Sequence, residues 1–334
     1  MFREGEAPAE PELSSEPRLG GSLALPYSMQ ELLDKPVVSM PSCDRDGSGV
    51  VELRKVHGRT VVTRARANSP LKLLNPRSAD SSAWMFTSTF GGGLLAGDQL
   101  ALTVDVGDDC TCLLGTQSAT KVYRSPHGLP AGQTLDVSVG NGATCVIAPH
   151  PVTCFAHARF VQRQRIELAS SSSLVLIDWF TSGRHASGER WAFDRYDSRT
   201  DVFIDGRHVF RDALLLSGDD GPIDSQHRTG GFDCFAYAVA LGIAFEEPVK
   251  QMLRQIEQEP VRTDTDRPLV FAASPLRVNC RSPSQMRCDA SQEAGGAILR
   301  VAGTGSEIVG RWLLDQLRFV DESLGSDRWS RMLQ

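Results

Sequence analysis

Two stretches of the chain repeat one another at an offset of 33 residues: Leu102-Thr-Val-Asp-Val-Gly-Asp-Asp-Cys-Thr-Cys112 and Leu135-Asp-Val-Ser-Val-Gly-Asn-Gly-Ala-Thr-Cys145. In each, apolar residues alternate with polar ones, and this period of two places the apolar side chains on one face of a β-strand. A looser third copy runs from Ile166 through Ser170 to Ser173 and into Leu174-Val-Leu-Ile177. The repeat predicts stacked β-layers, as in a solenoid or β-helix, and leaves a sandwich of hairpins as the alternative.

The turns inside the first two copies contain glycine next to a short polar residue. The pairs are Gly107-Asp108 and Gly140-Asn141. Such pairs favour turns that need a positive φ. Each copy is therefore expected to consist of a strand, a tight turn and a second strand.

Helical periodicity is found only late in the chain. Residues 247–258 carry a proline near the first turn and apolar residues at helical spacing, ending before Pro260. A second apolar stripe runs over 306–323. The expected fold is mainly β, with a β-helix-like stack and two late α-helices.

The chain divides into a leader and one domain. Residues 1–45 are rich in proline, glutamate and serine, a composition that cannot bury enough apolar surface to fold, so we expect a disordered acidic leader. Residues 46–325 form the expected β domain. The polar stretch 281–293 is expected to be an insert, and neither its role nor that of the leader follows from the sequence.

Composition excludes several classes of function. The formal net charge is −6 and basic residues are scattered, which argues against nucleic-acid binding. No stretch predicts a membrane-spanning helix or a secretory signal, so a cytoplasmic location is expected. Eight cysteines in 334 residues are too few for a disulfide scaffold and are expected to be free thiols.

The glycine-rich segment Gly91–Asp98 resembles a phosphate-binding loop only superficially. No Lys-Ser/Thr pair follows its last glycine, and a strand rather than a helix comes next. We expect a bend between strands, where backbones approach closely. No nucleophile elbow is present either, so the sequence shows no catalytic centre.

Metal-ligand spacing is weak. Cys110 and Cys112 point to one face of a strand, and His150, Cys154 and His157 form a loose second group. Neither group matches a Cys-x-x-Cys or His-Glu-x-x-His signature. Small buried cysteines explain the first group, and the second stays a weak candidate.

Two polar runs lie among the apolar strands. One is Thr116–Arg124; the other contains Arg184, Glu189, Arg190 and Trp191. Charges in such a setting cost free energy unless they are paired or solvated. The runs predict either hydrogen bonding at strand ends, with an Arg–Glu pair, or a polar channel or surface used by a partner or an ion.

The order of these blocks resembles the UreD/UreH family of urease accessory proteins. The resemblance extends over about residues 50–320 and includes Gly92–Asp98, Thr116–Arg124, Pro149–Phe155, Gly183–Trp191 and the helix around Trp312. The matching motif positions are Gly92, Gly93, Gly97, Thr116, Tyr123, Arg124, Gly183 and Gly188.

The resemblance implies a β-helix-like scaffold without enzymatic activity. It implies a UreF-type partner, a UreG-type GTPase held through that partner, and docking on apo-urease, into which nickel is inserted. An internal channel for nickel is part of what the family implies. No stably bound cofactor is expected, and Ni²⁺ is expected only in transit.

Candidate residues follow from this interpretation. A conduit should hold Ni²⁺ weakly, through isolated polar groups; the candidates for its lining are Asp98, Gln117, Lys121, Arg184 and Glu189. Trp312 and Leu317 are candidates for the partner interface, unless their stripe packs on the sheet. A β-solenoid enzyme and a cytosolic zinc or thiol protein remain as rival functions.

Overall fold

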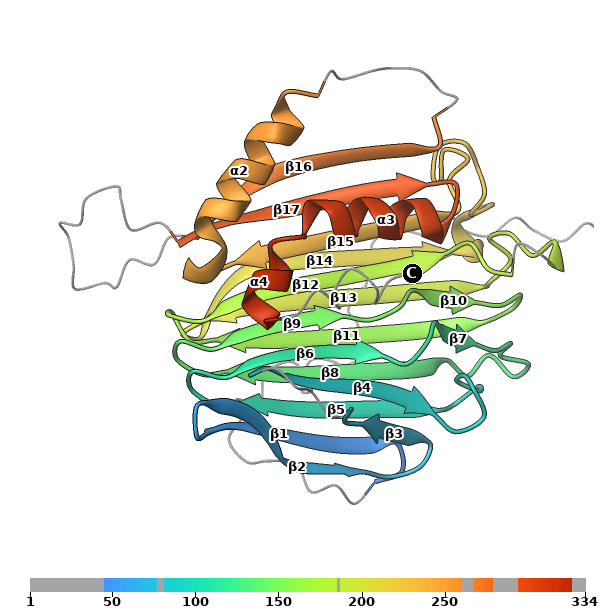
Figure 1. Ribbon diagram of the computed structural model, residues 1–334. Coiled ribbons are helices and arrows are strands. Elements are labelled where there is room, and N and C mark those ends of the chain that lie inside the picture. The colour runs from blue at the N-terminus through green and yellow to red at the C-terminus, as the bar shows by residue number, and fades with distance from the viewer. Residues whose placement is uncertain (1–44, 77–80, 185–186, 260–266, 279–293, 326–334) are drawn as a thin grey trace, which may run out of the picture. The chain divides into compact units, whose positions relative to one another are not determined.

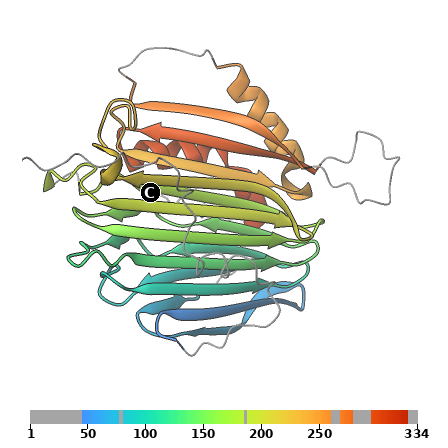
Figure 2. The ribbon, with the colours of Figure 1, turned by 180° about the vertical axis from the view of Figure 1, so that it is seen from behind.

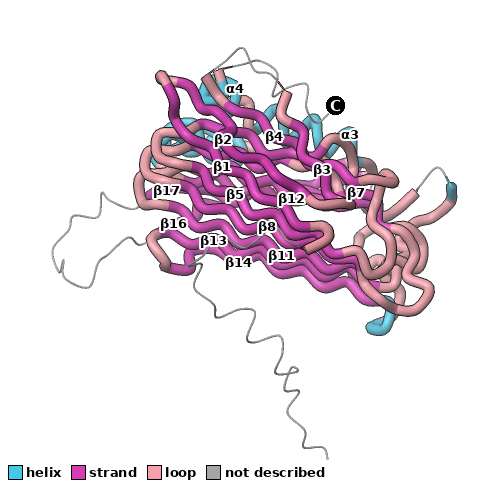
Figure 3. The backbone as a smooth tube through the Cα atoms, turned by 90° about the horizontal axis from the view of Figure 1, so that it is seen from below, coloured by secondary structure: helices cyan, strands magenta, loops and turns pink. Residues whose placement is uncertain are grey.

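The computed structural model describes residues 45–76, 81–184, 187–259, 267–278 and 294–325 (Figure 1). The predicted leader and the 281–293 insert lie outside these residues, except for Arg45. Within them, two sheets stack face to face, and three helices lie on one side (Figures 1 and 3).

Sheet A has seven strands in the order β14-β13-β11-β8-β5-β1-β2. Their bounds are β1 (Ser48–Val56), β2 (Arg59–Ala67), β5 (Gln99–Val106), β8 (Ala131–Val139), β11 (Arg159–Leu168), β13 (Arg195–Ile204) and β14 (Arg207–Ser217). The outer strands β2 and β14 pair antiparallel, and the inner neighbours pair parallel.

Sheet B has ten strands, eight of them in the order β16-β17-β15-β12-β9-β6-β4-β3. Their bounds are β3 (Leu71–Leu74), β4 (Ala83–Thr89), β6 (Thr111–Thr116), β9 (Thr144–Ala148), β12 (Ser173–Thr181), β15 (Cys234–Leu241), β16 (Leu269–Val278) and β17 (Ala294–Gly303). The short strands β7 (Thr120–Val122) and β10 (Val152–Cys154) pair with each other beside β12.

The predicted repeat is a coil of two strands. Leu102 pairs with Leu135 in sheet A, and Cys112 pairs with Cys145 in sheet B, so the 33-residue offset is the register of adjacent coils. The third copy also fits, since Ile166 pairs with Val137. Because the two strands of each copy join different sheets, the copies form a solenoid-like stack and not a sandwich of hairpins.

The turns differ in detail from the prediction. The positive φ falls on Asp109 (55°) and Gly142 (63°), not on the glycine pairs that precede them. Gly140 is needed for space instead: a Cβ there would lie 2.5 Å from Oδ1 of Asp108 in the neighbouring coil. These turns carry the chain from one sheet to the other, so their close contacts are with the next coil.

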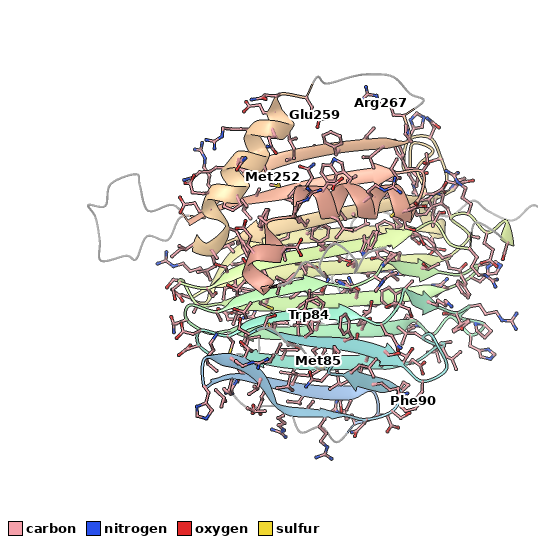
Figure 4. The ribbon with its side chains drawn as sticks, in the orientation of Figure 1. Trp84, Met85, Phe90, Met252, Glu259 and Arg267 are labelled. Atoms are coloured by element: carbon pink, nitrogen blue, oxygen red, sulfur yellow. The ribbon has the colours of Figure 1, made fainter. Side chains whose placement is uncertain are left out.

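Most of sheet B, from β4 to β15, is buried on both faces. Its inner side chains form a core with sheet A, and its outer side chains pack under helices α2 (Glu246–Glu257), α3 (Ser306–Gln316) and α4 (Val320–Leu324). Trp84 and Met85 on β4 show the alternation, since Trp84 belongs to the helix side and Met85 to the core between the sheets (Figure 4).

The helices largely match the prediction. The first spans Glu246–Glu257, one residue from the expected bounds. The expected helix over 306–323 is two helices, because α3 ends at Gln316 and α4 begins at Val320. The short 3-10 helices are η2 (Gly218–Asp220) and η3 (Ile243–Phe245). No helix among the described residues is long and apolar enough to cross a membrane.

Candidate functional site

The loops that follow successive strands of sheet B stack on one another at one end of the solenoid. Leu94 donates its N–H to the carbonyl of Lys121 at 2.8 Å, and Tyr123 donates to the carbonyl of Leu94 at 2.9 Å. Thr120 donates to Pro151 at 3.1 Å. We call these stacked segments, 90–98, 117–125, 149–158, 182–184 and 187–193, the loop layer. It gathers blocks that are far apart in the sequence.

The glycine-rich segment is the expected bend between β4 and β5. Gly92 and Gly97 have φ values of 73° and 86°, in the left-handed region. Gly93 leaves no room for a side chain, because a Cβ there would lie 2.5 Å from the Tyr123 ring. Asp98 holds the bend by accepting the N–H of Leu95 at 2.7 Å. It lines a separate shallow pocket beside Phe90, which Figure 4 labels.

Arg184 and Glu189 form an ion pair, which was one of the two interpretations of their polar run. Nε of Arg184 donates to Oε2 of Glu189 at 3.0 Å, and the same carboxylate accepts the N–H of Ala156 at 3.1 Å. The hydrogen bond from Arg184 lowers the pKa of Glu189. The guanidinium lies 4.3 Å from the centre of the Phe155 ring, which meets Tyr123 edge-on at 5.2 Å. This cluster ties three segments of the loop layer together.

The second metal candidate group does not assemble. His150 binds Thr116, its N–H donating to Oγ1 and its Nδ1 lying 2.8 Å from the carbonyl oxygen. Cys154 is buried, and His157 is exposed beside Asp194. No three His, Cys, Asp or Glu side chains meet in a group anywhere in the described part of the chain. Cys154 is a core residue, and its burial raises the pKa of its thiol.

Among the remaining candidate residues, Gln117 and Arg124 are exposed. Lys121 is among the residues that line an inner cavity. Gly183 has a φ of 128° and packs against the carbonyls of Cys154 and Glu189. At Gly188, a Cβ would meet no other atom within 4 Å. Trp312 stacks on Phe271 at 4.8 Å, and Leu317 is fully buried under sheet B. The alternative given for this stripe, packing on the sheet, therefore applies to Leu317.

A polar strip runs through the interior between the sheets. A cavity of about 100 Å³ below the loop layer is lined by Thr116, His150, Gln162, Gln164 and Asp178 among others. A second cavity of about 570 Å³, towards β14, is also lined by Asp178. Asp178 therefore stands where the two cavities approach each other.

Asp178 is held by side chains from three other strands. Its Oδ2 accepts hydrogen bonds from Nε2 of Gln162 at 2.8 Å and from Nε2 of Gln164 at 3.0 Å. The hydroxyls of Ser198 and Tyr237 each lie 3.4 Å from the same oxygen. Burial raises the pKa of Asp178 to about 6; the hydrogen bond from Gln162 opposes this and the charge of Asp212 adds to it. A buried carboxylate this well solvated by amides is a site that can interact with a passing cation.

Sequence reasoning missed this strip, although a signal was present. Asp178 is the single charge in the run Leu174–Phe180. On β11, the inner face carries Gln162 and Gln164 between the apolar residues Phe160 and Ile166. Polar residues at positions where the pattern demands apolar ones mark a functional interior.

The fold and the site together define a solenoid-like β protein whose apolar interior contains a polar strip around Asp178. A family model described as UreD urease accessory protein matches residues 45–332. The chain therefore belongs to the UreD family of urease accessory proteins.

Relatives from distant organisms agree. The chain is 40% identical over 312 residues to "Urease accessory protein UreD" of Anaeromyxobacter sp. strain Fw109-5, covering 92% of this chain and 98% of the relative. It is 42% identical over 285 residues to the protein of the same name from Sorangium cellulosum strain So ce56, covering 85% and 84%. It is 35% identical over 294 residues to "Urease accessory protein D" of Arabidopsis thaliana, covering 83% and 98%. A role in urease maturation follows from this membership.

Proposed function

We propose that this chain is a non-catalytic scaffold that binds apo-urease and a UreF-type partner, which holds a UreG-type GTPase, so that Ni²⁺ is inserted into the urease active site. The assembly acts in the cytoplasm. Ni²⁺ is cargo and passes through the protein without being held stably.

One observation supports a route for Ni²⁺ through the interior of the protein. A cavity between the sheets and a more open pocket towards β14 are both lined by Asp178, and amide and hydroxyl groups surround this carboxylate in an otherwise apolar sandwich. Burying polar groups in a core costs stability unless they are hydrogen-bonded, and proteins keep such groups mainly at functional sites. Oxygen ligands and one carboxylate attract a borderline cation without the thiolates that would trap it.

The loop layer belongs to the same proposal. Asp98, Gln117, Lys121, Arg184 and Glu189 stay candidates for a polar lining or its support. Of these, Lys121 lines the cavity below the loop layer, and the Arg184–Glu189 pair holds the loops above it.

The test is urease activation in cells that express urease and its maturation proteins, read as urease activity and as nickel per urease. Asp178→Asn keeps the shape and removes the charge, so we expect at least a tenfold loss of activation while the maturation complex still assembles. Asp315→Asn is the matched control, because Asp315 is more than half exposed on α3. Wild-type activation by Asp178→Asn would contradict the interior route.

Asp98→Ala and Glu189→Ala test the loop layer in the same assay. Partial loss of activation with an intact complex is expected for both. Full activation by both variants would remove these residues from the route. Stoichiometric zinc bound through cysteines in the purified protein would instead favour the rival zinc or thiol protein, and unaided turnover of a small molecule would favour the rival enzyme.

A further inference from the structure

Sheet B extends beyond sheet A at the β14 end. Nη2 of Arg300 on β17 lies 3.0 Å from Oδ1 of Asp212 on β14, so this ion pair links β17 to the edge strand of sheet A. The next strand of sheet B, β16, has no strand of sheet A opposite it among the described residues. The rear view shows β16 and β17 uncovered beyond β14 (Figure 2).

The uncovered face of β16 is exposed and largely apolar. Phe271 and Ala273 point to the helix side, where they pack in the outer cluster. Val270, Ala272 and Ser274 alternate with them and are exposed. We call this surface, the inner faces of β16 and β17 together with the free edge of β14, the shelf. It is continuous with the larger cavity, which Val270, Ala272 and Leu214 help to line.

We propose that the shelf binds one extended segment of a partner protein, which pairs with β14 as a further strand of sheet A. This inference rests on the proposed function as a scaffold, and it names how a partner is held. Strands lie about 4.8 Å apart and packed sheets about 10 Å apart, so a strand added to β14 would lie over β17, beside β16, and cover part of the exposed face. Backbone groups along an edge strand are unpaired and supply the binding energy in this mode of recognition.

The surroundings select the sequence of the segment. Its inward side chains must be apolar, because they contact Val270 and Ala272. Its outward side chains next to Arg211 lie beside a basic patch, since Asp201 is already paired with Arg199, His208 and Arg211. Alternating apolar and acidic residues therefore fit best.

A second copy of the chain does not fit the shelf. If β14 paired with β14 of another copy about a two-fold axis, the overhanging strands of sheet B from both copies would need the same space. A single extended segment avoids this clash.

Hydrogen exchange with synthetic peptides tests the proposal on the full chain. The probes are ten-residue peptides of alternating valine and glutamate or alternating valine and lysine. We expect the valine–glutamate peptide to slow amide exchange in β14 at least threefold, and the lysine peptide to do less. Ala272→Arg should abolish this protection, whereas Ile243→Arg, at a 66% exposed site outside the shelf, should keep it. Thermal unfolding checks that both variants fold.

The outcomes separate the two proposals. Absence of β14 protection, or protection that survives Ala272→Arg, overturns the shelf. Failure of the wild-type chain to support urease activation overturns the proposed function, whatever the peptides do. Protection of β14 together with loss of activation in Ala272→Arg, but not in Ile243→Arg, supports the shelf as the partner site.

Discussion

Gln162 on β11 and Asp178 on β12 are joined across the interior by a hydrogen bond of 2.8 Å from Nε2 to Oδ2. The bond links the two sheets at a position where both strands would otherwise carry apolar side chains. Three more polar groups complete the shell of the carboxylate. The interior is therefore polar at this point, and the effect of these polar groups on the free energy of unfolding should be measurable.

Asp178 should make stability depend on pH. Its pKa is about 6 in the folded protein and ~3.9 in the unfolded chain. The folded state therefore holds the proton more tightly, and the free energy of unfolding decreases as pH rises from about 4 to about 6. The variant Asp178→Asn has no carboxyl group at this position, so its free energy of unfolding lacks this dependence on pH. We expect the wild type to lose up to about 3 kcal/mol relative to the variant over that range, measured by urea unfolding. Parallel pH profiles would contradict the assignment.

Gly93 should tolerate no side chain. A Cβ would lie 2.5 Å from Cε2 of Tyr123 and 2.7 Å from the carbonyl oxygen of Lys121, so the loop layer must shift. We expect Gly93→Ala to lower the free energy of unfolding by about 1–3 kcal/mol. Gly218→Ala is the control, because its nearest contact would be 3.8 Å away. Equal effects of the two variants in urea unfolding would show that Gly93 is not packed as described.

Trp312 and Leu317 should behave differently although they share one helical stripe. Leu317 is fully buried, so Leu317→Ala should cost about 2–5 kcal/mol of stability. Trp312 is half-buried on Phe271 and is the part of the stripe that a partner can reach. If it is a partner contact, Trp312→Ala should weaken capture of the UreF-type protein at least tenfold in a pull-down at a temperature where the variant stays folded. Unchanged capture would assign the whole stripe to packing.

Much of the fold could be predicted from local patterns. The period of two located the strands, and the 33-residue repeat gave their register, because stacked coils place equivalent residues side by side. The bounds of α2 followed from apolar spacing and proline. An Arg–Glu pair was one of two interpretations of the run that contains Arg184, Glu189 and Arg190, because charges among apolar strands need partners, and the structure forms this pair between Arg184 and Glu189.

Other features depended on contacts between distant segments. Alternation shows which side chains share a face, but it does not show which sheet a strand joins, so the solenoid and the hairpin sandwich looked alike. Asp178 acquires its character from Gln162, Ser198 and Tyr237, which lie on three other strands. The shelf exists because sheet B extends beyond sheet A at the β14 end. This is a property of the whole stack that no single segment encodes. Local sequence thus determined the strands and their register, and tertiary packing decided the polar interior and the open edge, because both arise only where separate strands meet.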